Sequence, residues 1–155
     1  MSVNVTGLFT LTRELAPMLV AAATADRPTT VINLGSVMGH TTQAENAYSY
    51  SASKAAVHHL TRILAAEFAP NQVTGNAIAP GPFPSNMTRF AIGDEAGRAR
   101  ASKAVPMRRV GRPEDIAGTL LYLTGRAGAY TTGAIVPLDG GMSVAASRAM
   151  FGEGE

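Results

Sequence analysis

A tyrosine and a lysine stand four residues apart in the segment Tyr50-Ser51-Ala52-Ser53-Lys54. On a helix this spacing puts both side chains on one face, so the Tyr50 hydroxyl and the Lys54 ammonium would project toward one point. A nearby positive charge favours the phenolate over the phenol. A tyrosine prepared in this way can exchange a proton with a carbonyl or alcohol oxygen. The same spacing alone is also typical of a solvated helix face. Tyr48 offers no such coupling, because its partner four residues on is Ala52.

Ser36 is the second candidate, fourteen residues before Tyr50 and directly after the β-branched, apolar stretch 29–34. Open α/β sheets place their working residues where a strand ends and a loop begins. A hydroxyl at this point could donate a hydrogen bond to the same substrate oxygen. The alternative is a loop serine that caps its own backbone.

Short strands alternate with helices along the chain. The pattern predicts strands at 29–34, 73–79 and 134–138, helices at 3–25, 48–68 and 112–123, and mobile helical segments within 85–109. Such alternation predicts parallel βαβ units, and hence an α/β, Rossmann-type doubly wound sheet. Sheets of this kind commonly have about six strands. We therefore expect an incomplete sheet, the C-terminal half without its N-terminal strands. We place the domain at residues 1–146 and expect a disordered tail at 147–155.

Composition narrows the classes of function. The 155 residues are 46% hydrophobic. They contain no cysteine, which excludes disulfides and thiolate metal sites. His40, His58 and His59 lack the spacing of metal ligands, so we expect no metal and place each of them at the surface or at an interface. The net charge is only +2. A basic cluster has no aromatic residues between its members, which favours a solvated or anion-contacting loop over a nucleic-acid surface. It comprises Arg98, Arg100, Lys103, Arg108, Arg109 and Arg112.

No segment approaches the roughly 20 uninterrupted apolar residues that a membrane span requires. Met1 is not followed by a basic region and an apolar core of the signal-peptide kind. We therefore expect a soluble, cytoplasmic protein with no membrane partner.

Five motifs, in this order and near this spacing, resemble the short-chain dehydrogenase/reductase family. The resemblance runs from Asn4 to about Val144 and implies a Rossmann-fold oxidoreductase that uses NAD(P). Its motifs are Asn4-Val5-Thr6-Gly7, Val31-Ile32-Asn33-Leu34-Gly35-Ser36, Tyr50 to Lys54, Pro80-Gly81 and Asp139-Gly140-Gly141.

The resemblance implies a role for each of four residues. Tyr50 would be the general acid/base, and Lys54 would favour its phenolate form and hydrogen-bond the nicotinamide ribose. Ser36 would polarise the substrate carbonyl. Asn4 would hold a water in a proton relay to Lys54.

The resemblance also implies a cofactor site that includes Tyr50 and Lys54. Pro80 and Gly81 match the turn that borders the nicotinamide, and Ser85 stands where a threonine commonly contacts the cofactor. Phe83 belongs to the same loop. Hydride would come from the reduced cofactor, NADP with NAD left open, because no side chain can supply one.

Two further segments, Gly81–Arg89 and Gly128–Gly133, look like those of 3-oxoacyl-[acyl-carrier-protein] reductases of the kind linked to rhamnolipid biosynthesis. This implies reduction of a 3-oxoacyl thioester, either a small molecule or bound to a carrier protein. In the family, the helices that correspond to Asn4–Ala23 and Tyr50–Phe68 pair across a subunit interface. We therefore expect a homo-oligomer.

The sequence departs from the family at one point. No G-x-x-x-G-x-G turn, which would meet the cofactor pyrophosphate, precedes Asn4. Two interpretations follow: a truncated form of a working reductase, with little or no activity alone, or a non-catalytic short homologue that acts as a dimerisation or interaction module. The intact Tyr50–Lys54 pair favours the first. A hydrolase acting through Ser36 is disfavoured, because the G-x-S-x-G turn is absent and His40 has no evident acid to orient it.

Overall fold

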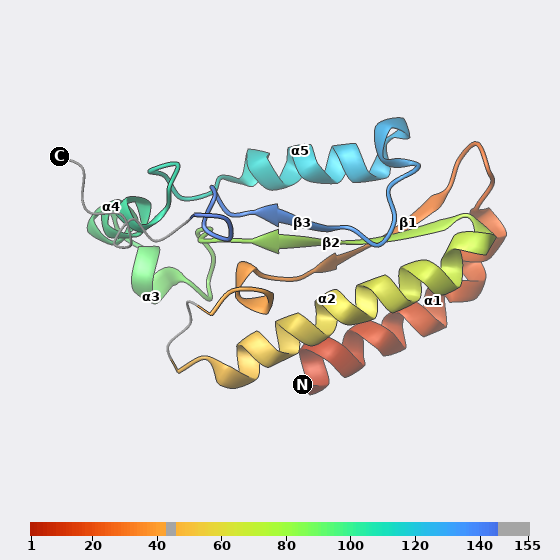
Figure 1. The fold of residues 1–155 in the computed structure, drawn as a ribbon, viewed down its shortest axis with the longest axis horizontal. Helices are drawn as coiled ribbons and strands as arrows, with labels where there is room; N and C mark the ends of the chain where they lie inside the picture. Colours follow the sequence, from red (N-terminus) through yellow and green to blue (C-terminus); the bar gives the residue numbers. More distant parts are fainter. Residues whose placement is uncertain (43–45, 146–155) are drawn as a thin grey trace.

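In the computed structural model, which describes residues 1–42 and 46–145, three parallel strands lie between two layers of helices (Figure 1). The strands are β1 (Thr29–Leu34), β2 (Val73–Pro80) and β3 (Ile135–Leu138), in the order β1-β2-β3. Both pairings are parallel. The predicted α/β class with a parallel sheet is therefore confirmed.

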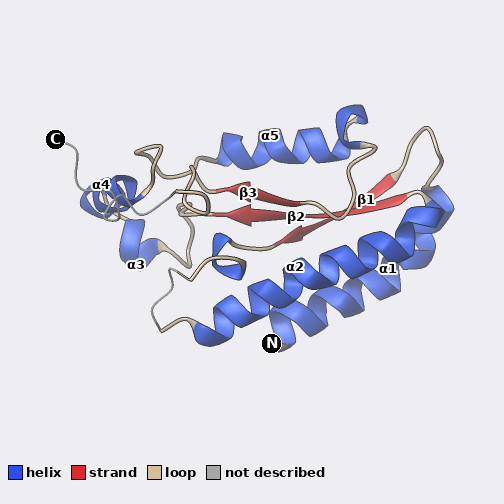
Figure 2. Cartoon of the chain, viewed as in Figure 1, coloured by secondary structure: helices blue, strands red, loops and turns tan. Residues whose placement is uncertain are grey.

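The helices are distributed over both faces of this sheet (Figure 2). Helices α1 (Leu8–Ala22) and α2 (Tyr48–Phe68) cover one face, and α5 (Pro113–Thr124) covers the other. Two shorter helices, α3 (Arg89–Ile92) and α4 (Glu95–Ala104), lie beyond the carboxyl ends of the strands. The site residues that follow β1 and β2 therefore share one end of the molecule with α3 and α4.

The core lies between β2 and α2. Residues 73–79 of β2 are all buried, and Val57 of α2 is fully enclosed. Gly75, which weakens the sequence signal for a strand, lies against α2. A Cβ built there would stand 3.3 Å from the Cα of Ala65, so the glycine lets the helix approach the strand closely.

Strand β1 is the more open part of the sheet. Within the described residues it pairs with β2 alone, and Leu34 at its end is 60% exposed. Helix α1 is tied to its start, because the Thr29 hydroxyl donates to the carbonyl oxygen of Leu19 at 2.9 Å. The packing of this edge is thus less complete than that of β2.

The boundaries of the elements differ from the predicted ones at a few points. The helix expected at 3–25 begins as a π-helical segment, Ser2–Gly7, and its α-helical part ends at Ala22 with Pro17 inside. The loop after β1 contains a 3₁₀ turn at Val37–Gly39. The predicted tail, 147–155, and the domain boundary at 146 lie outside the described residues.

The N-terminal helix is long and apolar. Residues Ser2–Ala22 form a run of 21 residues with a mean hydropathy of 1.2, of which 6% is buried, so by length and composition it could cross a membrane. It is not the run of uninterrupted apolar residues that we looked for in the sequence. The helix also carries Arg13 and Glu14, which form an exposed ion pair at 2.7 Å.

Candidate active site

Helix α2 presents Tyr50 and Lys54 one turn apart, as the spacing requires. The Lys54 ammonium lies 5.7 Å from the centroid of the Tyr50 ring, and it donates to the carbonyl oxygen of Leu34, at the end of β1, at 2.7 Å. Lys54 is only 8% exposed, and this burial lowers its pKa. A cation is thus held beside the phenol ring, at the end of a parallel strand.

Ser36 lies two residues past β1 and is 6% exposed. Its hydroxyl oxygen accepts the backbone N–H of Met38 at 3.2 Å, so it caps the turn Val37–Gly39. The Ser36 hydroxyl oxygen therefore caps its own backbone, as the second interpretation of this residue expected. A hydroxyl that accepts one hydrogen bond still has its own hydrogen to donate, so capping and contact with a substrate oxygen are compatible.

His58 was not expected at this site. It is 4% exposed, and its Nε2 accepts the backbone N–H of Ser36 at 3.3 Å. Our placement of His58 at the surface or an interface is wrong, because the loop after β1 covers it. Burial lowers the pKa of His58 to about 4, with smaller contributions from the charges of His40, Arg62 and Lys54. The available sequence signal was its position four residues after Lys54, on the same helix face.

Asn4 meets α2 beside the catalytic pair. Its side-chain nitrogen donates to the Ser53 hydroxyl at 3.0 Å, and that hydroxyl donates to the carbonyl oxygen of Tyr50 at 2.7 Å. Asn4 thus lies next to the residue that precedes Lys54, and it links the N-terminal segment to the first turns of α2.

The Pro80-Gly81 turn and the Asp139 segment lie against each other. The Gly81 N–H donates to the carbonyl oxygen of Leu138 at 3.0 Å, and a Cβ on Gly81 would come within 2.9 Å of the Asp139 Cα. The Asp139 carboxylate accepts the backbone N–H groups of Gly141 and Ser143. Burial alone would raise the pKa of Asp139, but these hydrogen bonds bring it below its usual value.

Phe83 and Ser85 belong to a loop with its own internal contacts. The Phe83 ring fills the space in front of Gly111, leaving no room for a Cβ there. The exposed Ser85 hydroxyl lies 3.0 Å from that of Thr88, which donates to the carbonyl oxygen of Phe83 at 2.7 Å. Sequence reasoning did not single out Thr88, whose hydroxyl organises this loop.

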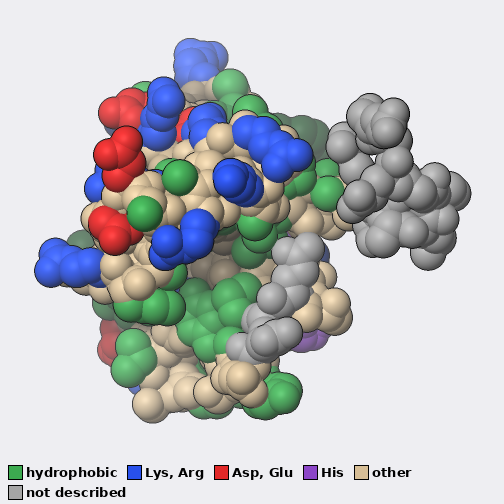
Figure 3. All heavy atoms as spheres, turned by 90° about the vertical axis from the view of Figure 1, so that its left-hand side faces the viewer, with side chains coloured by type: hydrophobic (Ala, Val, Ile, Leu, Met, Phe, Trp, Pro, Cys, Tyr) green, Lys and Arg blue, Asp and Glu red, His purple; other side chains and the backbone are tan. Residues whose placement is uncertain are grey.

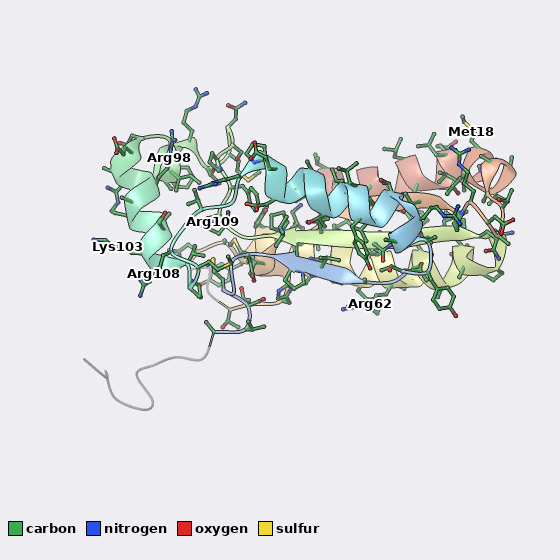
Figure 4. All side chains as sticks on the ribbon, turned by 90° about the horizontal axis from the view of Figure 1, so that it is seen from above. Met18, Arg62, Arg98, Lys103, Arg108 and Arg109 are labelled. Atoms are coloured by element: carbon green, nitrogen blue, oxygen red, sulfur yellow. The ribbon has the colours of Figure 1, made fainter. Side chains whose placement is uncertain are left out.

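Basic side chains gather over this end of the molecule. Figure 3 shows Lys and Arg side chains around its upper part, above a hollow lined with hydrophobic ones. Figure 4 shows Arg98, Lys103 and Arg108 at the same end, with Arg109 closer to the start of α5. A cavity of about 600 Å³ opens between the loop and α4, with Ser85, Arg89 and Arg98 in its wall.

The sequence matches, over residues 1–143, the family described as enoyl-(acyl carrier protein) reductase. The chain belongs to the short-chain dehydrogenase/reductase family. The resemblance inferred from its motifs is confirmed.

Relatives in this family include a rhamnolipids biosynthesis 3-oxoacyl-[acyl-carrier-protein] reductase from Pseudomonas aeruginosa. It is 46% identical over 141 residues, which cover 91% of this chain and 55% of the relative. A galactitol 2-dehydrogenase from Cereibacter sphaeroides is 40% identical over 93% of this chain and 56% of its own length. The chain therefore spans about half the length of the curated relatives it matches.

Solved structures of the family superpose on more than nine-tenths of the chain. The RhlG/NADP active-site complex of Pseudomonas aeruginosa has a TM-score of 0.87 and 45% identity, covering 91% of this chain and 57% of that one. A gluconate 5-dehydrogenase from Burkholderia cenocepacia, in complex with NADP and tartrate, has a TM-score of 0.83 and 28% identity, covering 94% and 55%. The three strands thus correspond to part of a Rossmann-type short-chain dehydrogenase/reductase sheet.

Proposed function

We propose that this chain carries the catalytic residues of an NADP-dependent reductase that converts a 3-oxoacyl thioester to the 3-hydroxyacyl form. The observation that carries the proposal is the Lys54 ammonium held 5.7 Å from the centroid of the Tyr50 ring, one turn along a helix and beside the end of β1. The substrate class is proposed from similarity to the Pseudomonas aeruginosa reductase.

In this proposal Tyr50 is the general acid that gives its proton to the carbonyl oxygen of the substrate. Lys54 stabilises the phenolate that results, since its charge is held nearby in a poorly solvated place. Ser36 donates its hydroxyl hydrogen to the same oxygen, where negative charge develops. Asn4, linked to Tyr50 through Ser53, would hold a water that returns a proton by way of Lys54.

The residues present fit the nicotinamide end of the cofactor, which supplies the hydride when it is bound. An ammonium has three hydrogens to donate, and Lys54 gives one to the carbonyl oxygen of Leu34, so the others suit ribose hydroxyls. The backbone of Pro80 and Gly81, with Phe83 and Ser85 in the loop after it, would border the ring. NADP is proposed over NAD because similar solved structures are NADP complexes.

We also propose that the protein is a cytoplasmic homo-oligomer. On one side of α1, Leu11, Leu15 and Met18 form an apolar stripe and are between 41% and 70% exposed. On α2 the small residues Ala52, Ala55 and Ala66 are exposed too. Small and apolar residues on neighbouring helices suit close packing against another copy. Residues 1–143 match one family of oxidoreductases, which supports an aqueous location for α1 over a membrane.

The first test is a titration of NADPH, followed by its own fluorescence, into the purified 155-residue chain. The sequence contains no tryptophan to interfere. Saturable binding is the expected result if the nicotinamide end suffices. A folded chain that does not bind NADPH would instead point to a fragment of the reductase or to an interaction module, and the exposed faces of α1 and α2 are the observation that supports the latter.

The second test compares Tyr50→Phe with Tyr48→Phe, in any form of the protein that oxidises NADPH with a 3-oxoacyl thioester. Tyr48 is 80% exposed and serves as the matched control. We expect Tyr50→Phe to reduce kcat by about 10²–10⁴-fold, the usual contribution of general acid catalysis, with NADPH binding retained. Tyr48→Phe should leave kcat unchanged. Equal activity of the two variants would remove Tyr50 from the mechanism.

A further inference from the structure

His58 has no part in the mechanism above, yet it continues the face of α2 that carries the catalytic pair. Tyr50, Lys54 and His58 follow one another at four-residue steps, so they lie along one side of the helix. His58 is 4% exposed, whereas His59, the next residue, is exposed. A buried imidazole needs a hydrogen-bond partner, and the partner that His58 finds is at the candidate site.

That partner is the backbone of Ser36. The Ser36 N–H donates to Nε2 of His58 at 3.3 Å across 22 residues of sequence. The contact requires Nε2 to be unprotonated, because a protonated ring nitrogen has no lone pair to offer. Ser36 is the residue whose hydroxyl we place against the substrate oxygen, so the imidazole holds the backbone from which that hydroxyl extends.

The loop around Ser36 is shaped to the ring on both sides. A Cβ on Gly35 would stand 2.7 Å from Cδ2 of His58, and a Cβ on Gly39 would stand 2.6 Å from Cε1. Backbone atoms also limit the space. The Cβ on Gly35 would lie 3.0 Å from the carbonyl oxygen of Ile78, and the Cβ on Gly39 would lie 2.9 Å from the carbonyl carbon of Lys54. Only glycine fits at either position while the ring is there.

We propose that His58 is a positioning residue, which fixes the Ser36 backbone, and through it the Ser36 hydroxyl, relative to Tyr50 and Lys54. The catalytic meaning of this role rests on the proposed function. The contact between the ring and the loop does not, and it can be tested separately.

Burial, with a smaller contribution from the surrounding charges, keeps the acceptor nitrogen of His58 unprotonated. Its pKa is lowered to about 4, first by burial and then by the charges of His40, Arg62 and Lys54. His40 follows the turn Val37–Gly39, and the other two residues lie on α2. The rings of His40 and His58 lie 5.4 Å apart. Near neutral pH the imidazole is therefore neutral and accepts from Ser36, and below about pH 4 a proton on Nε2 removes that bond.

The test is hydrogen exchange of the Ser36 amide, followed by NMR on the isotope-labelled 155-residue chain. His58→Gln and His58→Met have side chains of similar length, but only glutamine offers an oxygen that can accept the Ser36 N–H. His59→Gln is the control. We expect Ser36 exchange to accelerate about tenfold in His58→Met, to stay near the wild-type rate in His58→Gln, and to be unchanged in the control.

The comparison amide is that of Asn76, in the fully buried part of β2. General loosening of the fold would accelerate Ser36 and Asn76 together in both His58 variants, and that result would overturn the proposal. So would a Ser36 amide that exchanges equally in the wild type and in His58→Met. Should His58→Met fail to fold, the ring nitrogens of the wild type decide: a proton found on Nε2 at neutral pH would contradict the proposal.

Kinetics then separate this inference from the proposed function. If NADPH is oxidised, His58→Met should lower kcat about tenfold with little change in KM for NADPH, and His58→Gln should restore most of it. The expected exchange rates in a chain without turnover would sustain the contact between His58 and Ser36 independently of the reductase, because a truncated form is expected to have little activity alone. Turnover unaffected by His58→Met would sustain the reductase and refute the positioning role.

Discussion

At the residue scale, the candidate site consists of side chains whose polar groups are held in place by the backbone around them. Lys54 donates to the carbonyl oxygen of Leu34, Ser36 accepts from the Met38 N–H, and Asn4 reaches Tyr50 through Ser53. Such contacts restrict the rotamers of groups that must meet a substrate atom. The glycines at 35 and 39 belong to the same arrangement, because they make the space that His58 occupies.

Gly39→Ala should therefore destabilise the protein. Its methyl group would press on the His58 ring and on the Lys54 backbone, and overpacking of this kind costs about 1–3 kcal/mol. Gly118→Ala is the matched control, because a Cβ in that position on α5 meets nothing within 4 Å. Removing a helix glycine there should raise the free energy of unfolding by roughly 0.5–1 kcal/mol. Urea denaturation of the two variants measures both effects.

The combination with His58→Ala identifies the clash. If the ring is what the new methyl group meets, Gly39→Ala should cost less in a His58→Ala background than alone, and the two changes should not be additive. Additive losses would mean that the Lys54 backbone, and not the imidazole, limits the space.

At the element scale, the Asp115 carboxylate connects the N-terminus of α5 to the residues before it through an ion pair and a hydrogen bond from the backbone. The Arg109 guanidinium makes two contacts with Asp115, at 2.6 and 3.0 Å. The carboxylate also accepts the Arg112 N–H at 2.8 Å. Asp115 in the first turn complements the helix dipole. This arrangement connects the segment that contains Arg109 and Arg112 to α5, which covers the face of the sheet opposite α1 and α2.

These contacts predict a titration. The hydrogen bond from Arg109, followed by that from Arg112, lowers the pKa of Asp115 from 3.8 to about 2. A lowered carboxyl pKa stabilises the folded state above about pH 4, and the contribution disappears as the pH falls toward 2. Arg109→Gln should raise the Asp115 pKa toward 3.8, while Arg112→Gln should change it less, since the backbone N–H remains. Carboxyl carbon shifts in NMR follow the titration, and equal shifts in the two variants would contradict this account.

At the scale of the whole molecule, the two helical layers differ in the apolar side chains that they expose to solvent. Helices α1 and α2 share one face of the sheet, where α1 exposes its apolar stripe, and within the described part of the chain α5 is the α-helix on the other face (Figure 1). On α5, Leu121 is 73% exposed. Large apolar side chains gathered on one face are the usual sign of an association surface.

Charged substitutions can show which face associates. We expect the wild-type chain to be a dimer or larger by light scattering after size exclusion. Leu11→Glu or Met18→Glu should shift it toward the monomer, because a carboxylate would be buried in the interface. Leu121→Glu on α5 is the control and should leave the assembly intact. A monomeric wild type, or equal dissociation by Leu121→Glu, would refute the proposed interface.

The buried His58 also gives the whole molecule a pH dependence. In the unfolded chain this residue takes up a proton near pH 6.5, but in the folded chain only near pH 4. The unfolded state thus binds more protons between these values, so the free energy of unfolding should fall as the pH drops from 6.5 to 4, by up to about 3 kcal/mol. His58→Gln should flatten this slope and His59→Gln should not. Urea denaturation at several pH values compares the three proteins.

The sequence alone was sufficient to predict the features that depend on residues close together in the chain. The alternation of strands and helices, and the pairing of Tyr50 with Lys54, follow from the periods of the two regular structures. The ranges of β1 and β2 accordingly agree with the predicted ones to within one residue. Family membership rests on five such local motifs in order. The boundaries of α1 were less predictable, because the π-helical start and Pro17 depend on packing and not on periodicity.

Only the tertiary structure decided which groups meet across the chain. His58 is buried because the Gly35–Gly39 loop folds back over α2, and a pattern within one helix carries no information about that contact. Ser36 likewise combines a capping oxygen with a hydroxyl hydrogen that donates to no group in the described residues, and the sequence presented these two roles as alternatives. Residue spacing determines the face of a helix on which a side chain lies. What covers that face depends on a distant segment, and therefore on the fold.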